Sequence, residues 1–167
     1  MKTLIYVLLA TLVFGGRILY LYLRKRKKVK MLPVEAGPIA DAKDEDFITP
    51  VTVRVGDLQM NPSLEYFVVR NQCMRLMNIN AGDIIGVQLL DETFTIDKIE
   101  KGDILLIKLD DEKFRGHKIR VMDHPENDAF HTYYFIEENR QDSHFPHKFN
   151  NIRGVVKEIY HPNNFAA

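Results

Sequence analysis

The stretch YFVVRNQCMRLMNINAGDIIGV, residues 66–87, contains two apolar runs separated by a polar segment and a Gly-Asp turn. Val, Ile, Phe and Tyr favour β-strands, and Gly82 suits a tight turn because glycine adopts a positive φ without steric cost. The same Gly-Asp pair recurs at Gly102-Asp103, again just before an apolar run. Neither pair has the spacing of a phosphate-binding glycine loop. The stretch therefore predicts two strands connected through a turn, and no nucleotide site.

Short apolar runs of this kind continue on both sides, separated by Gly, Asn, Asp and Pro. Beyond about residue 47 no long stretch shows the 3.6-residue period of an amphipathic helix. The pattern predicts one mostly β domain over residues 47–167. The expected strands are 51–55, 65–70, 84–89, 93–96, 104–109, 117–122, 132–136 and 152–160.

The N-terminal segment differs from this domain in charge and hydropathy. The 167-residue chain has a net charge of zero, yet residues 1–34 hold eight bases and no acid, and the rest carries a net charge of −8. Residues 3–23 are uncharged except for Arg17, and a helix of that length spans about 30 Å, the thickness of a bilayer core. A cleaved signal peptide or a buried helix fits less well, because a basic run follows directly. We expect residues 1–30 to form a transmembrane anchor with a basic flank.

The flanking charges also predict an orientation. Six bases lie between Arg24 and Lys30, against Lys2 on the other side of the apolar run. The positive-inside rule then places the C-terminal domain in the cytoplasm, with a single pass through the inner membrane. Residues 3–30 would contact membrane lipid, and the basic run would meet anionic headgroups. Residues 31–46, which contain two prolines and a cluster of acids, are expected to be a linker.

The stretch 66–87 resembles the nucleophile segment of the LexA/UmuD-like self-cleaving proteins, distant relatives of type I signal peptidases. That family has a strand, a Ser-Met pair and a Gly-Asp turn nine residues after the serine. Here Cys73-Met74 takes the Ser-Met position, and Gly82-Asp83 falls at that spacing. Further matches follow in the family's order: Gly102-Asp103, Asp110-Asp111-Glu112, Lys118, Pro125-Glu126-Asn127 and Ile152-Arg153-Gly154-Val155-Val156. The resemblance implies a LexA-like fold of twisted, partly barrel-like antiparallel sheets, and a homodimer formed through this domain.

The resemblance also implies a site. Cys73 would be the nucleophile and Lys118 the general base, with His117 as the alternative base if the strand register is shifted by one residue. Gln72 and Met74 flank Cys73 as candidates for donating to an oxyanion or shaping the site. A thiol is intrinsically a better nucleophile than a hydroxyl, but sulfur is larger than the oxygen that the family geometry accommodates.

The linker itself contains a candidate cleavage site. Self-cleaving members cut an Ala-Gly or Cys-Gly bond about 35 residues before the nucleophile, and Gly37 of the Ala36-Gly37 pair lies 36 residues before Cys73. The resemblance thus implies regulated self-cleavage at Ala36-Gly37, which would separate residues 37–167 from the anchor.

Two other functions stay open. The domain could be a catalytically inactive interaction module tethered to the membrane, or a signal-peptidase-like processing enzyme acting on other chains, although such enzymes work outside the cytoplasm. Nucleic acid is not expected as a partner, because the domain is acidic and a membrane segment replaces the DNA-binding domain of the self-cleaving repressors. No cofactor or metal is expected, since the histidines lack helical His-x-x-x-His spacing and the single Cys offers no zinc-finger pair. The six histidines are His117, His124, His131, His144, His147 and His161.

Overall fold

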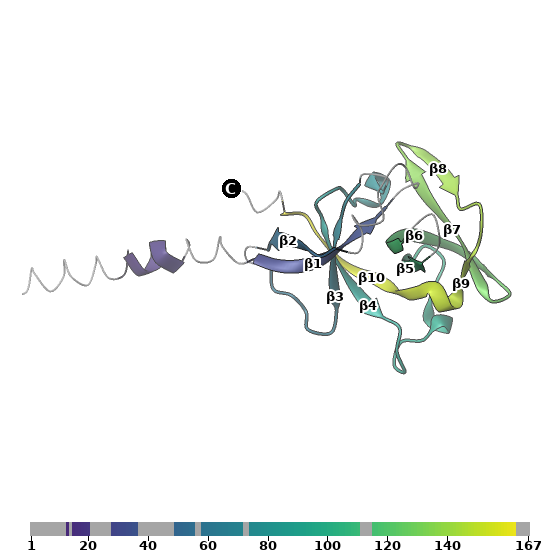
Figure 1. Ribbon diagram of the computed structural model, residues 1–167, viewed down its shortest axis with the longest axis horizontal. Coiled ribbons are helices and arrows are strands. Elements are labelled where there is room, and N and C mark those ends of the chain that lie inside the picture. Colours follow the sequence, from purple (N-terminus) through teal and green to yellow (C-terminus); the bar gives the residue numbers. More distant parts are fainter. Residues whose placement is uncertain are drawn as a thin grey trace, which may run out of the picture.

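The computed structural model describes residues 13, 15–20, 28–36, 49–55, 58–71, 74–110 and 115–162 (Figure 1). Within these ranges ten strands form one sheet, and three single-turn 3-10 helices cover residues 75–77, 96–98 and 149–151. The predicted mostly β domain is therefore confirmed. The strands are β1 (Lys28–Glu35), β2 (Val51–Arg54), β3 (Glu65–Val69), β4 (Ile84–Leu89), β5 (Ile104–Asp110), β6 (Arg115–Glu126), β7 (Ala129–Ile136), β8 (Asn139–Asp142), β9 (His147–Lys148) and β10 (Ile152–Tyr160).

Six of the strands close on themselves. The sheet order runs β2-β1-β3-β4-β10-β5-β6-β7-β8, and β1 also pairs with β6, which completes a ring of β1, β3, β4, β10, β5 and β6. Strand β1 pairs in parallel with both of its ring neighbours, whereas the other pairs of the ring are antiparallel. Figure 1 shows β2 and β8 on opposite sides of the domain, outside the ring. Because β1 is the closing strand, the ring depends on it.

Three apolar clusters hold the ring together. The interior cluster takes alternate residues from the ring strands, because side chains of a strand point to opposite faces in turn. A second cluster covers the outer face of β5 and β10, and a third lies between β2, β3 and β4. The interior cluster consists of Val34, Ala36, Phe67, Val69, Met74, Ile79, Ile85, Val87, Leu106, Ile119 and Val121.

Most predicted strands form close to where their apolar runs lie, and two match at both ends, β4 and β10. The strand predicted over residues 93–96 is wrong. There the Asp91 Oδ1 atom accepts hydrogen bonds from the Thr93 and Phe94 amides at 2.7 and 2.9 Å. The side chain thus stabilises a turn, which competes with extended pairing.

Strand β1 corrects the expected boundary between flank and linker. The charge and proline pattern predicts that residues 28–30 belong to the basic flank and residues 31–35 to the linker, but residues 28–35 form one strand that pairs with three others. Pro33 made a strand unexpected here, since proline is normally found in turns or on edge strands. Its pairing partner, Val68 of β3, is far along the chain, so tertiary pairing decides the local structure.

The predicted membrane anchor lies mostly outside the described residues. Residues 15–20 are helical, and the side chains of Ile18, Leu19 and Tyr20 are exposed. Among the described residues, no helix has the length and apolar content needed to cross a bilayer. The span over residues 3–23 stays a prediction.

Candidate functional site

The seam where β1 lies between β3 and β6 brings together the segment that ends at Ala36, the end of β3 and the part of β6 that carries Lys118. Val34 pairs with Val69 of β3 and with His117 of β6, and Glu35 pairs with Lys118. The chain leaves β3 toward Cys73, while β6 carries Lys118. The segment that precedes the predicted cleavage bond is therefore held between β3 and β6, the strand that carries Lys118.

Hydrogen bonds fix the end of β1 in this seam. The Arg70 amide donates to the Val34 carbonyl oxygen at 3.0 Å. The Ala36 amide donates to Asn71 Oδ1 at 2.6 Å. Val34 and Ala36 are both 0% exposed, with their side chains in the interior cluster that also contains Met74. Ala36, the residue before the predicted cleavage bond, is thus packed into the domain and is not part of an exposed linker.

Lys118 lies on the outer side of β6, opposite the interior cluster. It is 3% exposed, and its Nζ atom lies 3.4 Å from Oε2 of Glu35, which is 2% exposed. Burial raises the pKa of Glu35 above its usual value, even though the positive charges of Lys118 and Arg120 act to lower it. Desolvation outweighs the attraction between the charges here, as expected when a charged pair is buried with a long contact.

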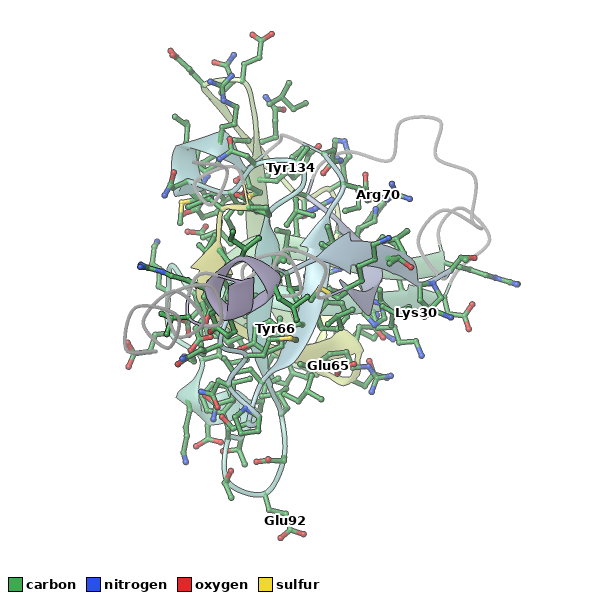
Figure 2. All side chains as sticks on the ribbon, turned by 90° about the vertical axis from the view of Figure 1, so that its left-hand side faces the viewer. Lys30, Glu65, Tyr66, Arg70, Glu92 and Tyr134 are labelled. Atoms are coloured by element: carbon green, nitrogen blue, oxygen red, sulfur yellow. The ribbon has the colours of Figure 1, made fainter. Side chains whose placement is uncertain are left out.

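Arg120 and His147 lie near the buried Lys118–Glu35 pair. Arg120 follows Lys118 by two residues, so both side chains point to the same face of β6. The Arg120 guanidinium lies 4.6 Å from the ring centre of Tyr134, which is labelled in the upper half of Figure 2, above Tyr66. Burial, together with the charges of Arg120 and Lys118, lowers the pKa of His147 to about 4. His147 is accordingly neutral near pH 7, and its buried Nε2 atom has no hydrogen-bond partner among the described residues.

His117, the alternative base, points the other way. Its ring packs against Phe67 at 5.2 Å between ring centres. Burial lowers its pKa to about 4, with Lys108 and Arg153 contributing. It lines a groove with Leu32, Lys108, Leu109, Asp110, Arg115 and Gly116. Of the two candidate bases, only Lys118 faces Glu35.

The predicted nucleophile cannot be placed from this structure. Cys73, Gln72 and Gly37 lie outside the described residues, so the predicted Cys73–Lys118 pair stays a prediction. Met74 is 0% exposed and packs in the interior cluster with Ala36, which is compatible with a role in shaping the site.

Four residues of the seam were not identified from the sequence. Asn71 lies two residues before Cys73 and carries no motif of its own, and Glu35 falls within the predicted linker. Arg120 could have been found by its two-residue spacing from Lys118, since such residues share a strand face. His147 gave no local signal, because β9 brings it near the Lys118–Glu35 pair through pairing with β7.

Comparison with known proteins identifies no family. No protein-family model matches the chain, and no curated protein matches it. The functional assignment therefore depends on the residues and geometry of the seam.

Proposed function

We propose that this chain is a membrane-anchored peptidase-fold protein, similar to the LexA/signal-peptidase group, that cleaves itself between Ala36 and Gly37. The observation that carries the proposal is the docking of β1 between β3 and β6. A peptide substrate commonly binds by adding a strand to a sheet, with alternate side chains buried in pockets. Val34 and Ala36 fit this mode, since both are fully buried and the backbone between them pairs on both sides.

In the proposed reaction the Cys73 thiol gives its proton to neutral Lys118, and the sulfur attacks the Ala36 carbonyl carbon. The backbone amide of Cys73 would stabilise the oxyanion. Lys118 then returns the proton to the Gly37 nitrogen as the peptide bond breaks, leaving a thioester on Ala36. Water hydrolyses the thioester and regenerates the thiol, with an Ala36 carboxylate as the second product.

Glu35 bears directly on this scheme, because a base must be unprotonated to accept the thiol proton. The ion pair with Glu35 favours the ammonium form of Lys118, but the burial that raises the pKa of Glu35 favours a neutral carboxyl group. Transfer of a proton from Lys118 to Glu35 would convert the charged pair into a neutral one. We therefore assign Glu35 as a positioning residue that shares the proton of the base.

The seam favours cleavage of the protein's own chain over cleavage of other chains. Its own β1 occupies the position between β3 and β6 where a substrate strand from another protein would have to bind. Because β1 is paired within the sheet, release of residues 37–167 from the anchor requires more than cleavage of the peptide bond. After cleavage, residues 28–36 would stay paired in the barrel, so that residues 37–167 leave the anchor only when β1 leaves the seam.

The same observation supports a second candidate function, a catalytically inactive module. Strand β1 closes the ring of six strands, which forms a small barrel, and a strand that closes a barrel is normally a permanent part of it. In that case the basic flank would continue directly into a folded domain held close to the membrane surface. Both candidates place the domain beside the bilayer, with Val13, Ile18, Leu19 and Tyr20 contributing exposed apolar side chains to the anchor.

The two functions are separated by intact-mass analysis of the full-length protein in detergent, incubated between pH 7 and 10. Self-cleavage predicts fragments ending at Ala36 and beginning at Gly37, in wild type and not in Cys73→Ala. Cys73→Ser should keep some cleavage, since the family nucleophile is serine. Fragments must be separated under denaturing conditions, because β1 would hold them together. If wild type stays intact at every pH, the inactive module is the better description.

A further inference from the structure

The hairpin that connects β6 to β7 carries a separate group of polar side chains that the seam does not use. His124 of β6 and His131 of β7 are direct partners in the antiparallel ladder. Glu126 follows His124 by two residues, so its side chain lies on the same face of β6. All three are accessible, with side-chain exposures of 55% for His124, 32% for His131 and 57% for Glu126.

The three side chains converge. The two imidazole rings stack at 4.5 Å between centres with an angle of 7° between their planes. The Nε2 atom of His131 contacts a carboxylate oxygen of Glu126. One ligand atom from each of the three residues lies within 4.8 Å of the other two. A shared metal ion at about 2.0–2.2 Å would require these atoms to move closer together, and the exposure of the side chains leaves them room to rotate.

An outer carboxylate supports this arrangement. Asp123 Oδ2 lies 3.1 Å from His124 Nδ1, which leaves Nε2 of that ring as the nitrogen directed to a ligand. Lys101 and Arg140 hold Asp123 in place through contacts of 2.9 and 3.0 Å. A bulge between Met122 and His124 shifts the strand register at this point, which allows the Asp123 side chain to contact the ring of His124. Histidines that bind metals are commonly oriented by such a carboxylate on the second ring nitrogen.

We propose that His124, Glu126 and His131 form a binding site for a divalent transition metal ion, Zn²⁺ above all. Two imidazoles and one carboxylate are an established zinc donor set, and three protein ligands leave one coordination position for water or another ligand. The ion would join β6 to β7 beside their turn. The sequence contains none of the helical or Cys-containing spacings that indicate a metal site, because these ligands come together only through the pairing of two strands.

The test is a titration of the full-length protein in detergent with ZnCl₂ after removal of bound metal by a chelator. We expect one saturable site per chain by calorimetry, and visible absorption bands when Co²⁺ replaces Zn²⁺. His124→Gln, His131→Gln and Glu126→Gln should each weaken Zn²⁺ binding by at least about tenfold. His144→Gln is the matched control, because His144 is an exposed histidine outside the cluster and should bind Zn²⁺ as wild type does.

Each variant is checked by far-UV circular dichroism. The exposed positions of the three ligands predict unchanged spectra, so that loss of binding reports on the ligands themselves. Absence of a saturable site in wild type would overturn the proposal. So would binding that the three ligand variants leave unchanged, or that His144→Gln weakens to the same extent.

Discussion

The most direct test of the seam is the substitution Lys118→Met, which removes the buried cation opposite Glu35 but keeps an unbranched side chain of similar length. Lys118 and Glu35 have side-chain exposures of only 4% and 2%. Removing one partner of a buried ion pair typically costs about 3 kcal/mol or more, and here it leaves the Glu35 carboxylate with Arg120 as the remaining positive charge that acts on it. With a typical urea dependence of about 2 kcal/mol per M, the unfolding midpoint should fall by about 1.5 M at pH 8.

The loss should depend on pH with a defined sign. Lys118 lowers the pKa of Glu35, so in the variant that pKa rises further above its usual value of 4.5. A carboxyl group whose pKa is raised by folding contributes its full stability below the unfolded pKa, and this contribution is lost as pH rises through the folded pKa. The deficit of Lys118→Met relative to wild type should therefore be small near pH 4.5 and largest at pH 8.

The assay is urea unfolding of the full-length protein in detergent at both pH values, followed by far-UV circular dichroism. Adding Glu35→Gln to Lys118→Met should restore most of the stability at pH 8, because the buried carboxylate that lost its lysine partner is then also removed. Lys108→Met, at an exposed lysine of the neighbouring strand β5, is the control and should change stability by less than about 0.5 kcal/mol. An equal loss at both pH values, or no recovery in the double variant, would refute the reasoning.

Three further outcomes are expected. Asn71→Ala removes the acceptor of the buried Ala36 amide, so the free energy of unfolding in urea should fall by about 1–3 kcal/mol and self-cleavage should be slower in intact-mass time courses. Asn71→Asp keeps an acceptor oxygen, so it should retain more of the stability and more of the cleavage rate. Gly154→Ala should destabilise the barrel severely, because the added Cβ would lie 2.2 Å from the backbone oxygen of Gln88; thermal unfolding measures this, and a near-normal midpoint would contradict it. A reporter enzyme at the C-terminus should be active only if it functions in the cytoplasm; activity of a periplasm-dependent reporter would reverse the predicted orientation.

The sequence by itself determined the β character of the domain and most of its strands. Apolar runs such as 84–89 and 152–160 predict strands because β-rich residues gather there between turn residues, and these signals are local. The turn at Gly82-Asp83 likewise forms where the sequence places it, with a positive φ at Gly82. The strand predicted at 93–96 failed because the Asp91 side chain forms a competing turn, an interaction that apolar periodicity does not register.

The candidate site divides in the same way. The sequence picked out Lys118 and Ala36 through a family pattern, but it could not show that they lie in one seam, since pairing between β1 and β6 joins residues more than 80 positions apart. Glu35, Asn71 and His147 gain their roles only from burial and contact. Local sequence determined which segments become strands, whereas the tertiary structure decided which strands are neighbours. Charge pairing and desolvation depend on those neighbours. The tertiary structure therefore decided the environment of Lys118 and Glu35 in the seam, and the proximity of His124 and His131 in the β6–β7 hairpin.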